Sequence, residues 1–410
     1  MLAPDTVAKI MNRDDLIGVV ADDFTGAMDT GVKFTRAGLE AVLLLQDRFS
    51  QVDWRVQVVS TNTRQTDAAT ARQRVMQAAR RLPTRHLFKK IDSTMRGHIG
   101  VEAEALLEVT GKTKAVVCAA VVEVGYRILD GCLWLNGVWL HKSDFAADPF
   151  WPTTTSRVTQ LVGVPATHIS LDTVKAGTAA LHEAIVNAPT AIVTVDASDQ
   201  ADIDTIGEAV VGGGFLPVGA RGLAEAWIRK LTSVHHLGAS VIFESEGPLL
   251  FVIGSYHPVS IAQADDLTAQ RGLSTVEVGV ETSESLDEKF RIITDSFSKD
   301  RSLVVRMPRQ AIKAAGHLQA ITSSLQALVL RICQEAGPGG LVIIGGETAN
   351  AICQVLHTEY VRIQGEFETA IPWGTLVGGT ASGLFIVTKG GGAGDVHSLT
   401  RLLDACRDGK

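Results

Sequence analysis

An apolar run that ends in two adjacent carboxylates is the feature that most constrains the fold of this chain. It lies in the segment LIGVVADDFTGAMDTGVKFTRAG, residues 16–38. Residues 16–21 have the length and branched side chains of a strand buried on both faces, and residues 25–37 repeat apolar side chains at helical spacing. Asp22 and Asp23 therefore occupy a strand-to-helix turn. In an open parallel sheet, ligands bind beyond the carboxyl ends of the strands, so we expect both aspartates, and Asp29 in the helix, near a ligand. The simpler alternative is that Asp23 caps the helix and Asp22 is solvated.

The alternation of strands and helices continues through the first half of the chain. Further strands are predicted at 41–45, 56–60, 86–91, 166–170, 191–196 and 215–219, with helices at 68–81 and 101–109. This alternation indicates an α/β fold with a parallel sheet covered by helices on both faces. Residues 129–140 differ, because Asn136-Gly137 between apolar runs predicts a β-hairpin.

Two more of these strands end in polar clusters. If the strand order brings the ends together, one crevice holds Asp22, Asp23, Arg64, Lys90, Asp92, Ser93, Thr94 and Arg96. That set suits a small polyhydroxylated acid, because arginine offers a planar fork to a carboxylate while Asp, Ser and Thr pair with hydroxyls. Lys89 and Lys90 point to opposite faces of the strand, and we favour Lys90 for the site. The alternatives are a helix cap at 92–94 and solvated arginines at 64 and 96.

In the second half, three strand ends carry small residues. Strands at 249–254, 340–344 and 383–388 run into glycine-containing turns, and a helix is predicted at 349–357. The residues of these turns are Gly254 and Ser255, then Gly345, Gly346, Glu347 and Thr348, then Lys389, Gly390, Gly391 and Gly392. Such turns let backbone N–H groups approach phosphates, so a nucleotide site is inferred here, although any one of them is equally explained as a tight connection. Neither GxxxxGK[ST] nor an N-terminal GxGxxG is present.

The length of the chain suggests two domains, and its composition bears on its partners and its cellular compartment. A chain of 410 residues exceeds the usual size of one core. We expect a loose leader at 1–14, an acid-sugar-binding domain at 15–235, a linker at 236–247 and a nucleotide-binding domain at 248–410. The net charge of −7 with mixed signs argues against nucleic acid as a partner. The sequence has no long apolar run and no signal core, which predicts a cytoplasmic protein without a membrane partner, and its five cysteines are expected to be reduced.

Several of these segments resemble a known family. ADDFTGAMDTG (21–31), TNTR (61–64) and KKIDSTMRGHIG (89–100) resemble the N-terminal domain of the four-carbon acid sugar kinases. GSYHPVS (254–260), GGETA (345–349), IPWG (371–374) and TKGGGAG (388–394) resemble their nucleotide-binding domain. Within the family, the likeness is greatest to D-threonate kinases, and the 3-oxo-tetronate kinases are similar but less close.

The resemblance implies a fold and a set of ligands. It implies two α/β domains, each a mainly parallel sheet flanked by helices, with the active site in the cleft between them. The acid sugar would be held by the ADDFTG aspartates, Arg64 and the segment 90–94 with Arg96 close by, and ATP by Ser255 and the turns at 345–348 and 390–392. Mg²⁺ is expected with ATP, with Glu347 or Asp395 as candidate ligands.

The sequence also departs from the family pattern. After the strand at 115–120, Tyr126 stands where an arginine is usual, and the usual proline is missing. Ala393 replaces a usual aromatic residue, and Tyr256-His257 replace small residues.

The resulting hypothesis is an ATP-dependent kinase that phosphorylates the C4 hydroxyl of a four-carbon sugar acid. D-threonate, giving 4-phospho-D-threonate, is the first candidate, with D-erythronate or 3-oxo-tetronate as alternatives. Asp22 or Asp23 would orient or deprotonate the hydroxyl, and which arginine holds the carboxylate is left open, as is a homo-oligomer. A NAD-dependent sugar-acid dehydrogenase is disfavoured by the missing GxGxxG, whereas a non-catalytic ligand sensor would explain the Tyr126 and Ala393 departures.

Overall fold

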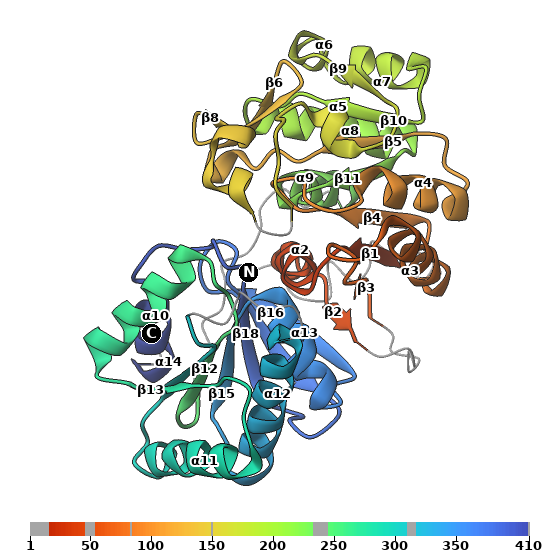
Figure 1. Cartoon of the computed structure of the whole chain (residues 1–410). Coiled ribbons are helices and arrows are strands. Elements are labelled where there is room, and N and C mark those ends of the chain that lie inside the picture. The colour runs from red at the N-terminus through yellow and green to blue at the C-terminus, as the bar shows by residue number, and fades with distance from the viewer. Residues whose placement is uncertain are drawn as a thin grey trace. The chain divides into compact units, whose positions relative to one another are not determined.

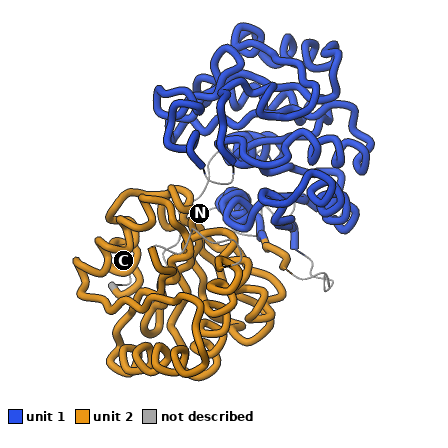
Figure 2. The backbone as a smooth tube through the Cα atoms, in the orientation of Figure 1, with its two compact units in different colours: residues 1–41, 53–238 blue, residues 42–52, 239–410 orange. Residues whose placement is uncertain are grey.

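The computed structural model describes residues 16–45, 54–82, 84–148, 151–232, 245–309 and 317–408. The chain divides into two units, which Figure 2 colours separately: residues 1–41 with 53–238 form unit 1, and residues 42–52 with 239–410 form unit 2. Residues 42–52 thus group with unit 2, although the predicted division placed them in the first domain. The predicted leader and most of the predicted linker lie outside the described residues, and the finer domain boundaries stay predictions.

Unit 1 is built on a parallel sheet (Figure 1). Its strands, in spatial order, are β3 (Val56–Ser60), β1 (Ile17–Ala21), β4 (His86–Lys90), β11 (Leu216–Gly219), β5 (Ala115–Cys118), β10 (Ile192–Val195) and β9 (Ala166–Ile169). Ala21 is in register with Ser60 on one side and with Lys90 on the other. The three strands predicted to deliver polar clusters are therefore neighbours, and their carboxyl ends are level.

Helices cover both faces of this sheet. The layer on one face contains α2 (Phe24–Arg36), α9 (Arg221–Thr232), α8 (Gln200–Gly213), α7 (Thr178–Asn187) and α6 (Leu171–Lys175), and that on the other contains α3 (Ala68–Arg81), α4 (Ile99–Thr110) and α5 (Val158–Val162). In α2, Met28, Val32 and Phe34 recur at helical spacing and are fully buried. Phe34 meets Trp227 of α9 edge-on, with ring centroids 6.3 Å apart. Because β1 leads into α2 on one face and its neighbour β4 leads into α4 on the other, the connections diverge and leave a crevice beyond these two strands.

A small antiparallel sheet is inserted after β5. It consists of β6 (Tyr126–Leu129), β7 (Cys132–Leu135) and β8 (Val138–Trp139), and short 3₁₀ helices flank it at Val122–Val124, Leu140–Lys142 and Asp144–Ala147. Asn136 and Gly137 turn the chain between β7 and β8 with φ of 52° and 83°, which confirms the predicted hairpin. Strand β6 was not predicted.

Unit 2 contains a second, mainly parallel sheet. The parallel strands are β13 (Ser274–Glu277), β14 (Leu303–Arg306), β12 (Leu249–Ile253), β15 (Gly340–Ile344) and β18 (Phe385–Lys389), followed by antiparallel β17 (Pro372–Val377) and β16 (Tyr360–Glu366), with β2 (Ala41–Leu44) next to β16. Helices α10 (Pro258–Arg271) and α14 (Ser398–Asp408) pack together on one face, and α11 (Ser283–Ser298), α12 (His317–Glu335) and α13 (Gly346–Val355) on the other. Phe251, Leu267 and Leu402 lie in one buried cluster that joins β12 to α10 and α14.

The connections diverge in unit 2 as they do in unit 1. Strand β12 leads into α10 on one face, while its neighbour β15 leads into α13 on the other. In each unit, a ligand crevice is expected where neighbouring strands send their connections to opposite faces of the sheet.

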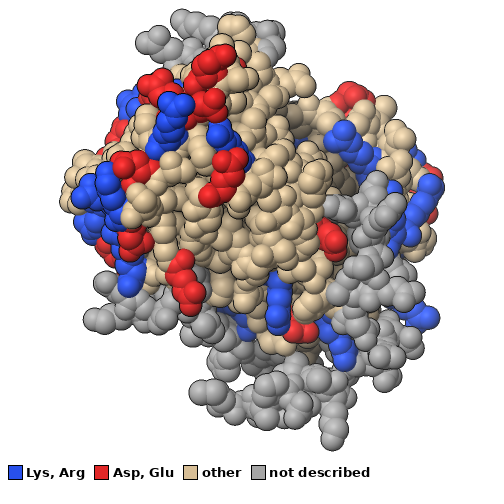
Figure 3. All heavy atoms as spheres, turned by 90° about the horizontal axis from the view of Figure 1, so that it is seen from below, with Lys and Arg blue, Asp and Glu red and all other residues tan. Residues whose placement is uncertain are grey.

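Two further expectations concern the cysteines and membranes. All five cysteines are free, as expected, and burial raises the pKa of the Cys118 and Cys353 thiols to about 12. Within the described ranges, no helix has the length and apolar character needed to cross a bilayer. On the face shown in Figure 3, acidic and basic side chains are interspersed. Oppositely charged pairs also lie on the surface of unit 1, where Lys230 is 2.8 Å from Glu208 and Lys175 is 2.7 Å from Asp199.

Candidate active site

Arg64 connects the carboxylates at the end of β1. Its Nε and Nη2 lie 3.0 and 3.1 Å from the two oxygens of Asp22, which is only 2% exposed. Nη2 is also 3.0 Å from Oδ1 of Asp23, and Nη1 is 3.8 Å from Oδ1 of Asp92. One guanidinium thus neutralises acids from the ends of both β1 and β4. Burial favours the neutral form of Arg64, but the three carboxylates outweigh it and raise its pKa well above the usual value.

Asp23 is also the N-cap of α2. Its Oδ1 accepts a hydrogen bond from the Gly26 N–H (2.8 Å), and its Oδ2 accepts one from the Thr25 hydroxyl (2.7 Å). The helix cap of the simpler alternative is therefore present, in addition to the contact with Arg64, but Asp22 is buried and paired with Arg64 and not solvated. Burial would raise the pKa of Asp23, but Arg64, Lys90 and the Thr25 hydroxyl together lower it. Asp23 is ionised at neutral pH.

Asp92 and Arg96 form a bidentate pair within the turn after β4. Nε and Nη2 of Arg96 lie 2.7 and 3.1 Å from the two oxygens of Asp92, and the Thr94 hydroxyl donates to the same carboxylate. Burial is again outweighed, mainly by Arg96 and Arg64, so the pKa of Asp92 is well below its usual value. Ser93 is half-buried in this turn. The predicted cap at 92–94 is not the one used, because α4 begins after His98 without a side-chain cap.

The two lysines at the end of β4 lie in different environments, because successive side chains of a strand point to opposite faces of the sheet. Nζ of Lys89 is fully buried and lies 2.7 Å from Oε2 of Glu102 in α4. Nζ of Lys90 lies at the other face, where a Cβ added to Gly26 would be 3.0 Å from it. Lys90 thus sits at the start of α2 beside Asp23, and the structure brings together every residue of the predicted acid-sugar cluster.

The structure adds residues that the sequence did not single out. Arg221, two residues beyond β11, is 4% exposed and has Nη1 3.2 Å from Oδ1 of Asp29; it also pairs with Glu123. A charged residue just after a strand was a signal that could have identified it. Asp148 has no such signal: its Oδ2 lies 2.9 Å from Nη1 of Arg96, and it belongs to the inserted segment.

A pocket of unit 1 is lined by the turn that carries Arg96. Its walls include Thr94, Arg96, Gly97, His98, Phe145 and Trp151. The Trp151 Nε1–H donates a hydrogen bond to the carbonyl oxygen of Arg64 (2.8 Å), so this wall of the pocket is attached to the loop that carries Arg64. Tyr126 lies near the same groups. Burial and the Asp92 carboxylate raise the pKa of its hydroxyl, and the Arg96 guanidinium only partly offsets this rise. The departure at position 126 therefore lies beside the predicted acid site.

In unit 2, the three glycine-containing turns follow neighbouring strands. Ile344 of β15 is in register with Ile253 of β12 and with Lys389 of β18, so the carboxyl ends are level. A Cβ added to Gly254 would collide with the hydroxyl of Thr348, and one added to Gly391 would collide with the hydroxyl of Ser255 and lie 2.8 Å from Cβ of His257. These two positions are glycine because the turns approach one another closely.

The start of α13 is suited to an anion. Its N-cap is Gly345, at φ 112°, and no side chain caps it. The N–H groups of the first turn then remain available to a ligand, with the positive end of the helix dipole behind them. The loop beyond β18 is fixed opposite by α10, because the Ser260 hydroxyl donates to the Gly391 carbonyl (2.7 Å) and Gln263 Nε2 donates to the Ala393 carbonyl (3.0 Å).

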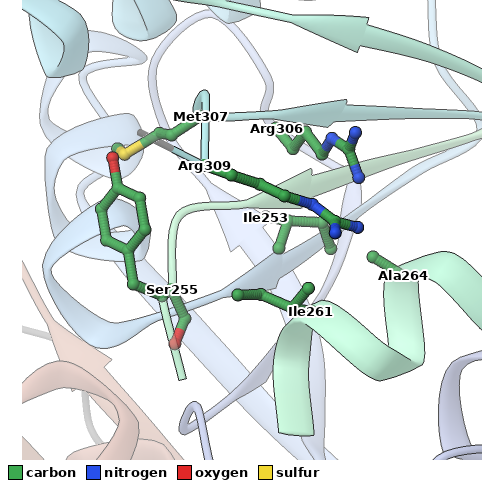
Figure 4. Close-up of a pocket in the computed structure, with 8 residues that line it drawn as sticks. Ile253, Ser255, Ile261, Ala264, Arg306, Met307 and Arg309 are labelled. Atoms are coloured by element: carbon green, nitrogen blue, oxygen red, sulfur yellow. The ribbon is translucent and has the colours of Figure 1, made fainter. Parts of the chain in front are cut away.

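A second pocket opens beside Ser255 (Figure 4). It is lined by Ile253, Ser255, Tyr256, Ile261, Ala264, Arg306, Met307 and Arg309. Among the residues that the structure describes, the buried Tyr256 hydroxyl has no hydrogen-bond partner, while Arg306 and Arg309 both pair with Asp265 of α10. The buried hydroxyl and the apolar side chains of Ile253, Ile261 and Met307 thus lie in the same pocket.

Comparisons with known proteins agree with this division. Residues 17–227 match the model of a sugar-binding N-terminal domain, and residues 250–399 match that of a nucleotide-binding C-terminal domain. A D-threonate kinase of Salmonella typhimurium is 30% identical over 93% of this chain and 96% of its own length. The chain belongs to the four-carbon acid sugar kinase family.

Other relatives differ in the acid that their names give. A D-erythronate kinase of Heliobacterium modesticaldum is 28% identical, covering 94% of this chain and 96% of its own. A 3-oxo-tetronate kinase of Brucella melitensis is 26% identical, covering 93% and 94%. Among solved structures, a Salmonella typhimurium protein described as a putative tRNA synthase superposes with a TM-score of 0.79 over 96% of this chain and 99% of its own at 20% identity, which supports the fold alone.

Proposed function

We propose that this kinase transfers the γ-phosphoryl group of ATP to the C4 hydroxyl of a four-carbon sugar acid, with D-threonate as the first candidate. The observation that carries the proposal is one chain with a carboxylate–arginine cluster at the crevice of one sheet and a glycine-lined helix start at the crevice of the other. The names of the relatives support the substrate class, and the 30% identity to a D-threonate kinase supports the choice of acid.

Asp23 is the group we assign to the reacting hydroxyl. Asp22 is 2% exposed and has both oxygens on Arg64, whereas the Asp23 side chain is 18% exposed. Its lowered pKa makes Asp23 a weak base, so its main role is to accept a hydrogen bond and hold the hydroxyl in line. That role suffices in phosphoryl transfer, where positioning and charge stabilisation account for most of the catalysis.

Arg96 is our choice for the acceptor carboxylate. Both arginines are engaged, Arg64 by three aspartates and Arg96 by Asp92 and Asp148, but of the two it is Arg96 that lines the pocket of unit 1. Thr94 and Ser93, in the same turn, would pair with the acid's hydroxyls. Tyr126, where the family usually has arginine, would then contact the acceptor and affect which acid is chosen.

On the nucleotide side, we assign the phosphates to the start of α13 and the loop 390–392. The base would enter the pocket beside Tyr256, whose hydroxyl lacks a partner. Mg²⁺, when bound, would neutralise the phosphate charge. The exposed Glu347 in the first turn of α13 fits a single protein ligand for it, because Asp395 is held by Arg401 (3.0 Å). The cleft between the domains that the resemblance implies remains a prediction.

The test is ADP release with a panel of acceptors. Purified protein with Mg·ATP would be given D-threonate, D-erythronate, L-threonate or 3-oxo-tetronate, with a sample lacking acceptor as the baseline and ¹³C NMR to place the phosphate on C4. We expect D-threonate to give the highest kcat/KM. If no acid raises ADP release above the baseline while acids still bind, the protein is a ligand sensor and the proposal fails.

A further inference from the structure

Lys389, the last residue of β18, has a buried amine that pairs with no carboxylate among the residues that the structure describes. Its side chain is 0% exposed. Nζ donates to the carbonyl oxygens of Gly390 (3.0 Å) and Gly391 (3.5 Å), both in the glycine loop. Lys89 in unit 1 is equally buried but has Glu102 at 2.7 Å. The same chain thus shows how a buried lysine is normally satisfied, and Lys389 is not satisfied in this way.

The position of Lys389 joins two of the glycine-containing turns. Its carbonyl oxygen accepts a hydrogen bond from the Gly345 N–H (3.0 Å), and its amine lies below the loop at 390–391. A buried ammonium without a counter-ion is unfavourable, so burial lowers the pKa of Lys389 to about 7. Carbonyl oxygens stabilise the ammonium only partly, and a doubly charged phosphate would stabilise it much more.

We propose that Lys389 acts as a proton-binding positioning residue for the nucleotide: when a nucleotide binds at this turn, the amine takes one proton from solvent and becomes the ammonium partner of the phosphates. The inference rests on the proposed nucleotide site and adds a proton to its binding equilibrium. In this equilibrium, the free protein with a neutral amine, one solvent proton and Mg·nucleotide combine to give the complex in which the ammonium faces the phosphates.

The direction of the pH effect follows from the two protonation states. The ordinary value for lysine is near 10.4. Between pH 7 and that value, the free protein holds a neutral amine and the complex a charged one, so nucleotide affinity falls as pH rises, by up to about tenfold per unit. Below pH 7 both states are charged, and this dependence disappears.

Proton uptake by Lys389 must be distinguished from proton uptake by other titratable groups near it. They are Tyr256 and His257 before α10, Glu347 at the start of α13 and Asp395 after the glycine loop. Among the described residues, the amine's hydrogen bonds go to the carbonyl oxygens of Gly390 and Gly391. His257 is the one that could also take up a proton near neutrality, since its Nδ1 accepts from the Val259 N–H (3.2 Å) and its ring lies 3.3 Å from where a Cβ on Gly392 would be.

Calorimetry on the full-length protein tests the inference. Mg·AMPPNP would be titrated at pH 8.0 in phosphate, HEPES and Tris buffers, whose different ionisation enthalpies report the number of protons taken up per nucleotide. At this pH, histidine and the phosphates, whose pKa values lie near 6 to 6.5, contribute little. We expect an uptake of about 0.9 proton for wild type, from a group with a pKa of about 7.

Three variants assign the proton. Lys389→Met keeps the length of the side chain without the amine, and Lys389→Arg keeps a permanent charge; both should show no proton uptake, and Lys389→Arg decides if Lys389→Met no longer binds. His257→Asn retains a good N-cap and should still take up the proton. Uptake that persists in the Lys389 variants, or that is lost in His257→Asn, overturns the inference. Binding by wild type without uptake also overturns it but leaves the proposed function standing, whereas no binding at all refutes the nucleotide site.

Discussion

At the residue scale, Asp23 has two contacts that an amide would treat differently. Asparagine caps helices as well as aspartate does, so Asp23→Asn should leave the melting temperature nearly unchanged. It cannot pair with Arg64 as an anion or hold a hydroxyl as strongly. We expect kcat for the acid to fall about 10²- to 10⁴-fold, the range for a positioned acid–base group, with AMPPNP affinity unaltered.

Asp22→Asn is the matched control for this substitution. Asp22 is buried, and both its oxygens accept from Arg64, so the amide leaves a buried guanidinium short of charge. It should lower the melting temperature clearly, which Asp23→Asn should not. Normal turnover in Asp23→Asn, with folding intact, would move the orienting role away from Asp23.

Asp92 gives a prediction about acid stability. Its pKa is lowered well below 3.8 in the folded protein, so the stabilisation it brings is complete above about pH 4 and is lost as pH falls through the folded value. Asp92→Asn lacks this contribution at every pH. The difference in urea midpoint between wild type and Asp92→Asn should therefore be largest at pH 6 and should shrink towards pH 3.

Tryptophan fluorescence is a suitable signal for that measurement, because five of the six tryptophans belong to unit 1. Since Asp92 lies in the same unit, the signal reports mainly on the fold that it stabilises. A midpoint difference that stays constant from pH 6 to pH 3 would mean that Asp92 is not held ionised by Arg96 and Arg64.

At the element scale, alanine substitutions at two neighbouring glycines test whether the loop after β18 must approach its neighbours closely to bind nucleotide. A Cβ on Gly391 would collide with Ser255 and lie 2.8 Å from His257, whereas one on Gly390 meets no protein atom within 4 Å. Gly391→Ala should therefore displace the loop and weaken AMPPNP binding by about tenfold or more, and Gly390→Ala should cost less. Equal affinities in the two variants would exclude the loop geometry as the reason for glycine at 391.

The alternation of strand and helix, and the turns that follow the strands, were predictable from sequence. Apolar runs that end in Asp22 or Gly345 mark both a strand and its carboxyl end, and in a parallel sheet all such ends lie at one edge. Polar residues at those ends therefore come close together when their strands are neighbours. This is why the polar cluster of unit 1 could be assembled before its coordinates were known.

Elements and residues outside that rule were missed for physical reasons. Strands β16 and β17 pair antiparallel with each other between β18 and β2, and neither ends in a polar or glycine-rich cluster of the kind used for prediction. Asp148 reaches Arg96 from a segment 52 positions away, and no local pattern encodes so distant a contact. Arg221 follows the strand-end rule, but it is the first residue of α9 and stands between two glycines that drew attention only as a turn.

At the scale of the whole molecule, the two halves of the proposed chemistry belong to different units. The residues assigned to the acid, such as Asp23 and Arg96, lie in unit 1, and those assigned to the nucleotide, such as Gly391 and Lys389, lie in unit 2. Binding of each ligand should therefore depend on its own unit, while turnover should depend on both.

A crossed set of binding measurements checks this. We expect Arg96→Lys, which replaces a planar guanidinium with a single ammonium, to weaken D-threonate binding about tenfold and to leave the Kd for AMPPNP within twofold of wild type. Gly391→Ala should do the reverse, and both should lower kcat/KM, because phosphoryl transfer requires the two ligands together. If Arg96→Lys weakened nucleotide binding as much as acid binding, the two sites would be coupled already in the absence of the second ligand, and the assignment of each ligand to one unit would be wrong.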